Sequence, residues 1–346
     1  MIAHQLDHLV RPNILALKPY SSARHEFKGV ANIQLDANEN PYETGMNRYP
    51  DPFHAAIRER LSLLKNVPVE SIFLGNGSDE VIDLLIRIFC IPGIDHIITP
   101  RPTYGMYKVS AATSDVAVKE ILSFPDFQLN VPELLAAVTP QSKLLFLCHP
   151  NNPSGNALRE GDVLRSLRDF PGIVVIDEAY IDFCTSKSFL PRLVDFPRLV
   201  IMQTFSKAWG LAGLRLGMAF ASSYIIDLLY KVKPPYNVNV LTQMEAVRAL
   251  EDAPRKEQWV ANILAQRQRL QEELSELTMV KTILPSDANF LLVRFDEPKD
   301  WFEYLKTKGI VIRSMTHAAH CSDCLRITVG TALENEELIQ ALKNRM

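Results

Sequence analysis

Short, uninterrupted apolar runs alternate with helical patterns through the first two thirds of the chain, and this alternation limits the fold more than any other feature. The runs at 143–148, 173–176 and 199–205 consist mostly of successive apolar and β-branched residues, so both faces of each strand are expected to be buried. Such strands are typical of parallel sheets with helices on both faces. Further strands are expected at 96–99 and 116–121, and helices at 53–64, 104–112, 131–138, 162–170, 222–232 and 241–251. The sequence therefore predicts an α/β fold with a mostly parallel sheet.

The pattern changes after residue 251. A long helix is expected at about 256–277, followed by short strands at 279–284, 289–295, 309–314 and 325–329 and helices at 299–308 and 334–344. This α+β pattern predicts a second, smaller domain. Near the N-terminus, Pro12, Pro19 and neighbouring polar residues predict an extended arm in place of a packed element. We therefore expect an N-terminal arm at 1–30, a large domain at 31–250 and a small C-terminal domain at 251–346.

The composition is that of a globular protein, because 47% of the 346 residues are hydrophobic and 22% are charged. The net charge of −3 argues against a nucleic-acid partner, which would favour a basic face. No apolar run reaches the roughly 18 residues of a membrane span, and the N-terminus lacks the pattern of a signal peptide. Five scattered cysteines fit a reducing compartment. We expect a cytoplasmic protein.

Polar side chains follow three of the predicted strands. Asn152, Asp177 and Lys207 each lie just past the C-terminal end of a strand. Ligands of open α/β sheets bind at that edge, so we expect the three side chains to converge. Desolvation at the edge of an apolar layer would lower the pKa of Lys207 and make it a nucleophilic amine. The alternative, a lysine whose charged end reaches solvent, stays open at this point.

A glycine turn, GNGSDE at 75–80, precedes a helical pattern. We expect Ser78 to cap this helix, whose free N–H groups and dipole would favour an anion. Ser206 and Arg215, which flank Lys207 in TFSKAWGLAGLRLG (204–217), could help to hold a phosphate there. The motif matches no standard nucleotide-binding pattern, so a well-capped helix without a ligand is the alternative.

Two arginines interrupt apolar strands of the small domain. Arg313 follows Ile310-Val311-Ile312, and Arg326 lies between Leu325 and Ile327, so each is expected to point into a cleft. Arginine forks bind carboxylates and phosphates bidentately. A salt bridge to a surface carboxylate is the alternative for each.

These features together indicate pyridoxal 5′-phosphate (PLP) as cofactor. Lys207 could form an imine with its aldehyde, and Asp177 could keep its ring nitrogen protonated. Asn152 and Tyr180 could bond the ring oxygen, while Tyr104 could stack on the ring face.

The sequence resembles fold-type I PLP-dependent aminotransferases, and within them the histidinol-phosphate aminotransferase family. The resemblance covers nearly the whole chain. The resemblance rests on the sequence blocks RPNILALKPYSSAR (11–24), NENPY (38–42), RYPDP (48–52), GNGSDE (75–80), PTYGMY (102–107), HPNNPSG (149–155), VIDEAYIDF (175–183), TFSKAWGLAGLRLG (204–217) and LRITVGT (325–331).

The resemblance implies a role for each residue of these blocks that matches the family. Lys207 would hold the cofactor and shuttle the proton, Asp177 would pair with the pyridine nitrogen, and Asn152 and Tyr180 would bond the ring oxygen. Holding the cofactor phosphate would be the role of Ser206, Arg215 and the backbone amides of Ser78 and Asp79.

The resemblance also implies residues outside this group. Tyr49 would reach the cofactor phosphate of the other subunit, making the protein a homodimer with shared sites. Arg326 would bind the substrate carboxylate, and Arg313, with Tyr20 of the arm, would bind the phosphate of histidinol phosphate.

The implied reaction exchanges an amino group between glutamate and imidazole-acetol phosphate, giving 2-oxoglutarate and histidinol phosphate. An aromatic aminotransferase or a phosphothreonine-type decarboxylase of the same fold would share most of these motifs. A PLP-binding regulatory domain is disfavoured because the chain has no room for an added DNA-binding region. A Rossmann dehydrogenase is disfavoured because Gly210, Gly213 and Gly217 lack the required spacing.

Four possible metal ligands, His317, His320, Cys321 and Cys324, lie within eight residues. Structural zinc sites usually combine pairs of ligands from separated segments. We therefore expect a loop between two strands and no metal.

Overall fold

The sheet expected from the apolar runs lies at the centre of the molecule. The computed structural model describes residues 6–19, 26–27, 29 and 32–345. Its first sheet has the order β1-β7-β6-β5-β4-β2-β3, in which β3, β2, β4, β5 and β6 run parallel and β7 pairs antiparallel with both β6 and β1. The strands are β1 (Ile72–Gly75), β2 (His96–Arg101), β3 (Ala117–Leu122), β4 (Ser142–Cys148), β5 (Ile173–Asp177), β6 (Leu199–Thr204) and β7 (Gly217–Ala221).

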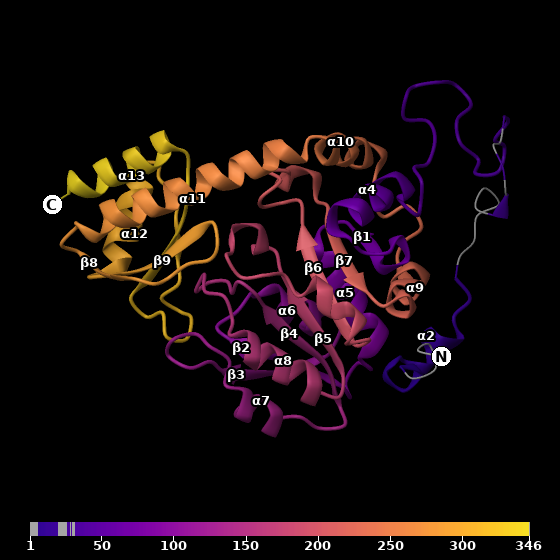
Figure 1. Cartoon of the computed structure of the whole chain (residues 1–346), viewed down its shortest axis with the longest axis horizontal. Helices are drawn as coiled ribbons and strands as arrows, with labels where there is room; N and C mark the ends of the chain where they lie inside the picture. Colours follow the sequence, from indigo (N-terminus) through magenta and orange to yellow (C-terminus); the bar gives the residue numbers. More distant parts are fainter. Residues whose placement is uncertain (1–5, 20–25, 28, 30–31, 346) are drawn as a thin grey trace.

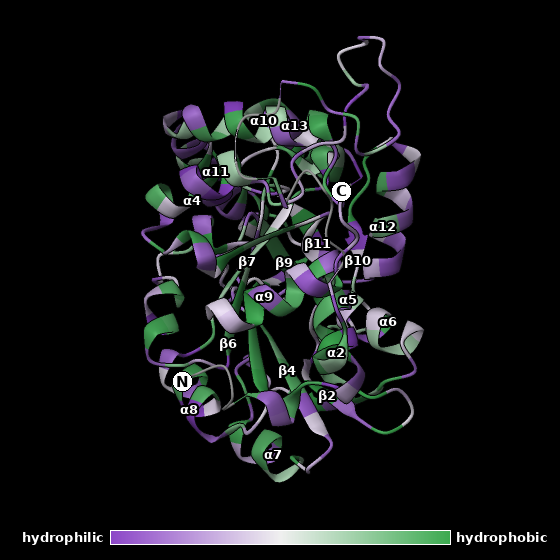
Figure 2. Ribbon diagram, turned by 90° about the vertical axis from the view of Figure 1, so that its right-hand side faces the viewer, coloured by the Kyte–Doolittle hydropathy of each residue, from purple (hydrophilic) through white to green (hydrophobic). Residues whose placement is uncertain are grey.

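Helices cover both faces of this sheet, as predicted. Successive side chains of β4 point to opposite faces, so Leu144 and Phe146 join one apolar core while Leu145 and Leu147 join another. The first core is closed by α5 (Ser78–Phe89), α6 (Met106–Thr113) and α9 (Ser223–Val232). The second is closed by α4 (Ala55–Lys65), α7 (Val131–Ala136), α8 (Glu160–Asp169) and α10 (Val240–Glu251). Figure 2 shows the apolar strands enclosed by helices with polar outer faces.

A second sheet lies at one end of the molecule (Figure 1), with the order β10-β11-β9-β8, all antiparallel. Its strands are β8 (Val280–Ile283), β9 (Phe290–Phe295), β10 (Arg313–Ser314) and β11 (Cys324–Thr328). It packs with α11 (Ala253–Ser275), α12 (Pro298–Thr307) and α13 (Ala332–Lys343) around a third core. The long helix α11 connects the two parts. The proposed boundary at residue 250 stays a prediction.

The prediction of an extended arm is wrong for residues 6–16. A short 3-10 turn (Asp7–Leu9) and the helix α2 (Pro12–Ala16) pack onto the first core through Leu6, Leu9, Val10 and Ile14, all buried. Pro12 does not prevent this because it is the first residue of α2, where its missing N–H needs no partner. Burial of apolar side chains at a helical spacing stabilises this packed segment despite its proline.

Two helices begin at residues that differ from the prediction. The first, α4, begins at Ala55, because His54 has a left-handed backbone with φ 55°; the Asp51 carboxylate accepts from the N–H of Ala55 at 2.7 Å. Ser78 is the first residue of α5 and does not cap it. The N-cap is Gly77, whose φ of 80° favours glycine. Among the described residues, no helix is both long and apolar enough to cross a lipid bilayer.

Candidate active site

The C-terminal edge of the large sheet brings the predicted residues together. Loops after β4, β5 and β6 carry Asn152, Tyr180 and Lys207, and Asp177 is the last residue of β5. They line a small cavity of about 90 Å³, here called the inner pocket. Its predicted members are Ser78, Asp79, Tyr104, Asn152, Asp177, Tyr180, Ser206, Lys207 and Arg215, joined by Cys148, Ala179 and Thr204.

Lys207 lies on a turn directly after β6. Its ammonium is 5.5 Å from the centre of the Tyr180 ring. Burial and the nearby Arg326 lower the pKa of the Lys207 ammonium, whereas Asp177 raises it. A lowered pKa raises the fraction of the lysine that is a neutral amine at a given pH, which suits both nucleophilic attack and proton transfer.

Asp177 is buried and hydrogen-bonded on both carboxylate oxygens. Its Oδ2 accepts from the hydroxyl of Tyr107 at 2.7 Å, and its Oδ1 accepts from the N–H of Ala179 at 3.1 Å. Burial raises the pKa of Asp177 to about 6, against the lowering effect of the Tyr107 hydrogen bond. The carboxylate can therefore pair with a protonated ring nitrogen.

Tyr107 is a site residue that the sequence analysis missed. It is fully buried, and its ring stacks on Phe146 at 4.8 Å between centroids. Its block, PTYGMY, was noted, but only Tyr104 was singled out. A usable signal was present, since a tyrosine on an otherwise buried helix face needs a partner for its hydroxyl.

Asn152 connects the two parts of the molecule. Its Nδ2 donates to the hydroxyl of Tyr180 at 3.3 Å, and its Oδ1 accepts a hydrogen bond from Nη1 of Arg326. Arg326 is on β11 of the second sheet, so a residue of the small C-terminal part contacts the wall of the inner pocket. The guanidinium also lies 5.3 Å from the ring centre of Phe290.

The start of α5 forms an anion-binding corner. The first N–H groups of a helix have no partner within it, and the α5 N-cap, Gly77, offers no side chain to them. Arg215 reaches this corner, where its Nη2 lies 3.3 Å from Oδ2 of Asp79. The hydroxyl of Tyr104 donates to the other oxygen of Asp79 at 3.1 Å. The Arg215 guanidinium and the first N–H groups of α5 therefore meet at one end of the inner pocket.

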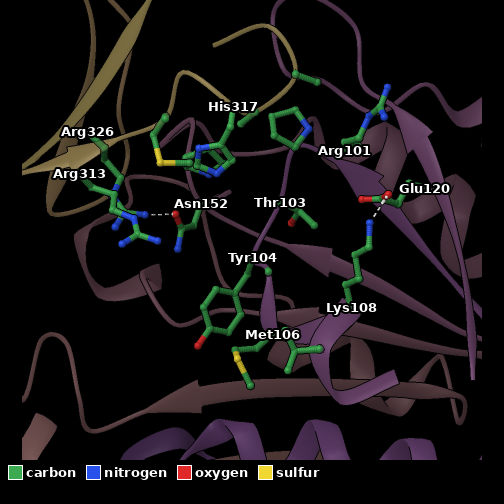
Figure 3. Close-up of a pocket in the computed structure, with 17 residues that line it drawn as sticks. Arg101, Thr103, Tyr104, Met106, Lys108, Glu120, Asn152, Arg313, His317 and Arg326 are labelled. Carbon is green, nitrogen blue, oxygen red and sulfur yellow. Dashed lines mark hydrogen bonds and ion pairs between the residues drawn. The ribbon is translucent and has the colours of Figure 1, made fainter. Parts of the chain in front are cut away.

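A larger cavity of about 870 Å³, here called the outer cavity, opens beside the inner pocket. Arg313 and Arg326 are direct partners across β10 and β11. Figure 3 shows them side by side at one end of this cavity, next to Asn152. Burial lowers the pKa of Arg326. Among the described residues neither arginine forms an ion pair with a carboxylate, so the salt-bridge alternative finds no support there.

The remaining predicted residues lie apart from this group. Tyr49 is half-exposed, does not line the inner pocket, and stacks on Tyr236 at 4.4 Å between ring centroids. Tyr20 lies outside the described residues.

Of the four possible metal ligands, His317, His320 and Cys321 lie between β10 and β11, and Cys324 is the first residue of β11. His317 lines the outer cavity, and Nε2 of His320 lies 2.9 Å from the carbonyl oxygen of Ser123. Cys321 and Cys324 are buried in an apolar cluster with Phe127. No three metal-binding side chains gather into a possible metal site within the described ranges.

Comparison with known proteins identifies the family. The family model for class I and II aminotransferases matches residues 28–342. The histidinol-phosphate aminotransferase of Parabacteroides distasonis is 51% identical over 339 residues, with 98% of each chain covered. That of Cytophaga hutchinsonii is also 51% identical, over 346 residues and 99% of each chain.

Solved structures agree on the fold. The histidinol-phosphate aminotransferase of Clostridium acetobutylicum has a TM-score of 0.79 at 23% identity, covering 87% of this chain and 91% of its own. That of Sinorhizobium meliloti, solved with pyridoxal-5′-phosphate, has a TM-score of 0.78 at 22% identity, covering 86% and 84%. The fold-type I architecture predicted from the sequence is confirmed. The chain belongs to the class I and II aminotransferases and, within them, to the histidinol-phosphate aminotransferase family.

Proposed function

We propose that this protein is a PLP-dependent aminotransferase that exchanges an amino group between glutamate and imidazole-acetol phosphate, giving histidinol phosphate and 2-oxoglutarate. The observation that carries the proposal is the pair Arg313 and Arg326, which face the outer cavity without a carboxylate partner among the described residues. Two adjacent guanidinium groups can bind a substrate that carries a phosphate, and they can also bind the two carboxylates of glutamate. The names of the relatives point to the same substrate.

The inner pocket fits the cofactor. Lys207, with its lowered pKa, suits an aldehyde, and buried Asp177 suits a ring nitrogen that must stay protonated. The corner at Ser78, Ser206 and Arg215 suits a phosphate. When bound, PLP supplies an electron sink that stabilises negative charge at the substrate Cα.

The chain supplies the proton transfer and the orientation. Lys207, with its lowered pKa, would act as the general base that moves the proton at the substrate Cα, where bound PLP would stabilise negative charge. Asn152 and Tyr180, which are hydrogen-bonded to each other, would hold the ring oxygen, and the hydrogen bond from Arg326 to Asn152 supports a substrate-carboxylate site beside them. Orientation of this kind lowers the entropic part of the barrier.

We further propose a homodimer with shared sites, in which Tyr49 of one subunit reaches the cofactor phosphate of the other. Exposed Tyr42, Met46 and Tyr49 on one segment support an interface there. We also infer a cytoplasmic location, supported by five free cysteines.

An absorbance spectrum between roughly 300 and 500 nm tests the proposal, because PLP bound to a lysine absorbs there. We expect a chromophore whose long-wavelength band disappears on adding histidinol phosphate and changes far less with phenylalanine or phosphothreonine. A chromophore that ignores histidinol phosphate would reject the substrate, and a response to phenylalanine or phosphothreonine would favour the two same-fold alternatives. Absence of any chromophore after adding PLP would reject the role of Lys207.

A further inference from the structure

Tyr49 is held more firmly than its exposure suggests. It belongs to the segment 32–54 before α4, which Figure 1 draws on the side of the molecule away from the small sheet. The side chain of Glu39 is only 3% exposed, although much of this segment is open to solvent. Its Oε1 accepts from the backbone N–H of Tyr49 at 2.7 Å, and its Oε2 accepts from Nη1 of Arg48 at 2.7 Å. A buried carboxylate needs such donors, so Glu39 fixes the backbone at Tyr49.

The ring of Tyr49 is fixed by a second contact. Tyr236 stacks on it with an interplanar angle of 11°. Tyr236 lies between α9 and α10, and the next residue, Asn237, donates to the carbonyl of Leu74 at 3.1 Å and to Oε2 of Glu80 at 2.7 Å. The stack is therefore tied to β1 and α5, the elements that form the anion-binding corner.

The one polar atom of the Tyr49 side chain, its hydroxyl oxygen, remains available for a partner. Its hydroxyl makes no hydrogen bond with any of the residues that the structure describes, and the side chain is 50% exposed. A tyrosine whose backbone and ring are both held offers a donor at a fixed place with little conformational entropy left to lose. That arrangement suits a partner brought from outside the chain.

We propose that Glu39 and Tyr236 are positioning residues, which hold Tyr49 ready for the cofactor phosphate of a second copy of this chain. The inference rests on the proposed function, and on the shared sites in particular. Glu39 acts through the backbone of Tyr49 and Tyr236 through its ring, so loss of either residue should resemble loss of the Tyr49 hydroxyl.

The first test measures the dissociation constant of PLP by absorbance titration of the apoprotein. We expect Tyr49→Phe, Glu39→Ala and Tyr236→Ala each to weaken PLP binding about tenfold, the effect of one hydrogen bond to a charged group. Tyr236→Phe keeps the ring and should restore most of the affinity. Adding either alanine substitution to Tyr49→Phe should cause little further loss, because the three residues act through one hydroxyl. Fully additive losses would overturn the proposal.

The second test asks whether the residues act on the other subunit. Each variant is mixed with Lys207→Ala and re-associated, so that a hybrid dimer has one site with both Lys207 and a correctly held Tyr49. At a PLP concentration too low to fill the variant sites, random pairing should give hybrids that contribute about a quarter of the wild-type activity for Glu39→Ala and for Tyr236→Ala. No recovery with these two, while Tyr49→Phe does recover, would overturn the positioning roles.

A failure of the proposed shared site gives a different result from a failure of the positioning roles. If Tyr49→Phe also shows no recovery, the shared site is rejected. Glu39→Gln, which keeps the shape of the side chain, is the control for a folding defect in Glu39→Ala. Size-exclusion chromatography verifies that every variant is dimeric. A monomeric wild type would reject the dimer and with it this inference.

Discussion

At the scale of single residues, Tyr107 stabilises the ionised form of Asp177 through one hydrogen bond of 2.7 Å. Burial raises the pKa of Asp177 to about 6, and the Tyr107 hydroxyl stabilises the charged form. Tyr107→Phe should therefore raise this pKa further and weaken PLP binding at pH 6 by roughly tenfold, since a hydrogen bond to a charged group contributes about 1.5–3 kcal/mol.

Titrating PLP affinity from pH 5.5 to 8.5 would measure this effect. The Asp177 carboxylate must be ionised to hold the ring nitrogen. The PLP affinity of Tyr107→Phe should therefore approach that of the wild type as the pH rises above the raised pKa of Asp177. An affinity loss of the same size at every pH would show that Tyr107 acts only by packing.

The arginine pair gives a second prediction at this scale. Arg326→Lys should lower kcat/KM for histidinol phosphate roughly 100-fold, because lysine cannot keep both a bidentate substrate contact and the bond to Asn152. Arg313→Lys, which has no such internal bond, should lose less, about tenfold. Arg101→Gln, on the same cavity wall, is the matched control for general loss of positive charge. Equal losses in all three variants would argue for a nonspecific electrostatic effect.

At the scale of elements, β7 sets the position of the α5 N-terminus. A Cβ on Gly217 would lie 2.2 Å from the backbone N of Ser78, a distance that no side chain tolerates. Gly217→Ala should therefore separate β7 from α5, destabilise the protein by about 2–4 kcal/mol and weaken PLP binding. Thermal unfolding with and without PLP measures both effects. Gly213→Ala is the control, because a Cβ there meets nothing within 4 Å; an equal loss in both variants would reject the role of close packing.

The elements also show what the sequence could predict. The strands β4, β5 and β6 were identified because strands buried on both faces must be apolar throughout. The strand β7 was not, since GMAFA (217–221) has none of the β-branched residues that mark strands. The same limit applies to the site. Residues at strand ends, such as Asp177 and Lys207, could be predicted as site residues because ligands of open α/β sheets bind at the C-terminal ends of the strands. The contacts of Tyr107 and Glu39 depend on tertiary packing, which local spacing does not encode.

At the scale of the whole molecule, a buried histidine should make the fold sensitive to acid. His54 is 1% exposed, neither ring nitrogen has a hydrogen-bond partner among the described residues, and burial, with Lys233 adding to it, lowers its pKa to about 4. The unfolded chain takes up this proton near pH 6.5, so the stability that His54 gives at neutral pH is lost as the pH falls from about 6.5 towards 4.

Urea unfolding at pH 7.5 and pH 5 would measure this loss. Between these two values the wild type should lose roughly 2 kcal/mol more than His54→Asn, which accepts the left-handed backbone at this position and does not titrate there. Other titrating groups contribute alike to both proteins, so they cancel in the comparison. His8→Asn, at an exposed position, should keep the wild-type dependence. If His54→Asn shows the same loss as the wild type, the acid sensitivity must come from elsewhere, and His149, whose pKa burial also lowers to about 4, becomes the residue to replace next.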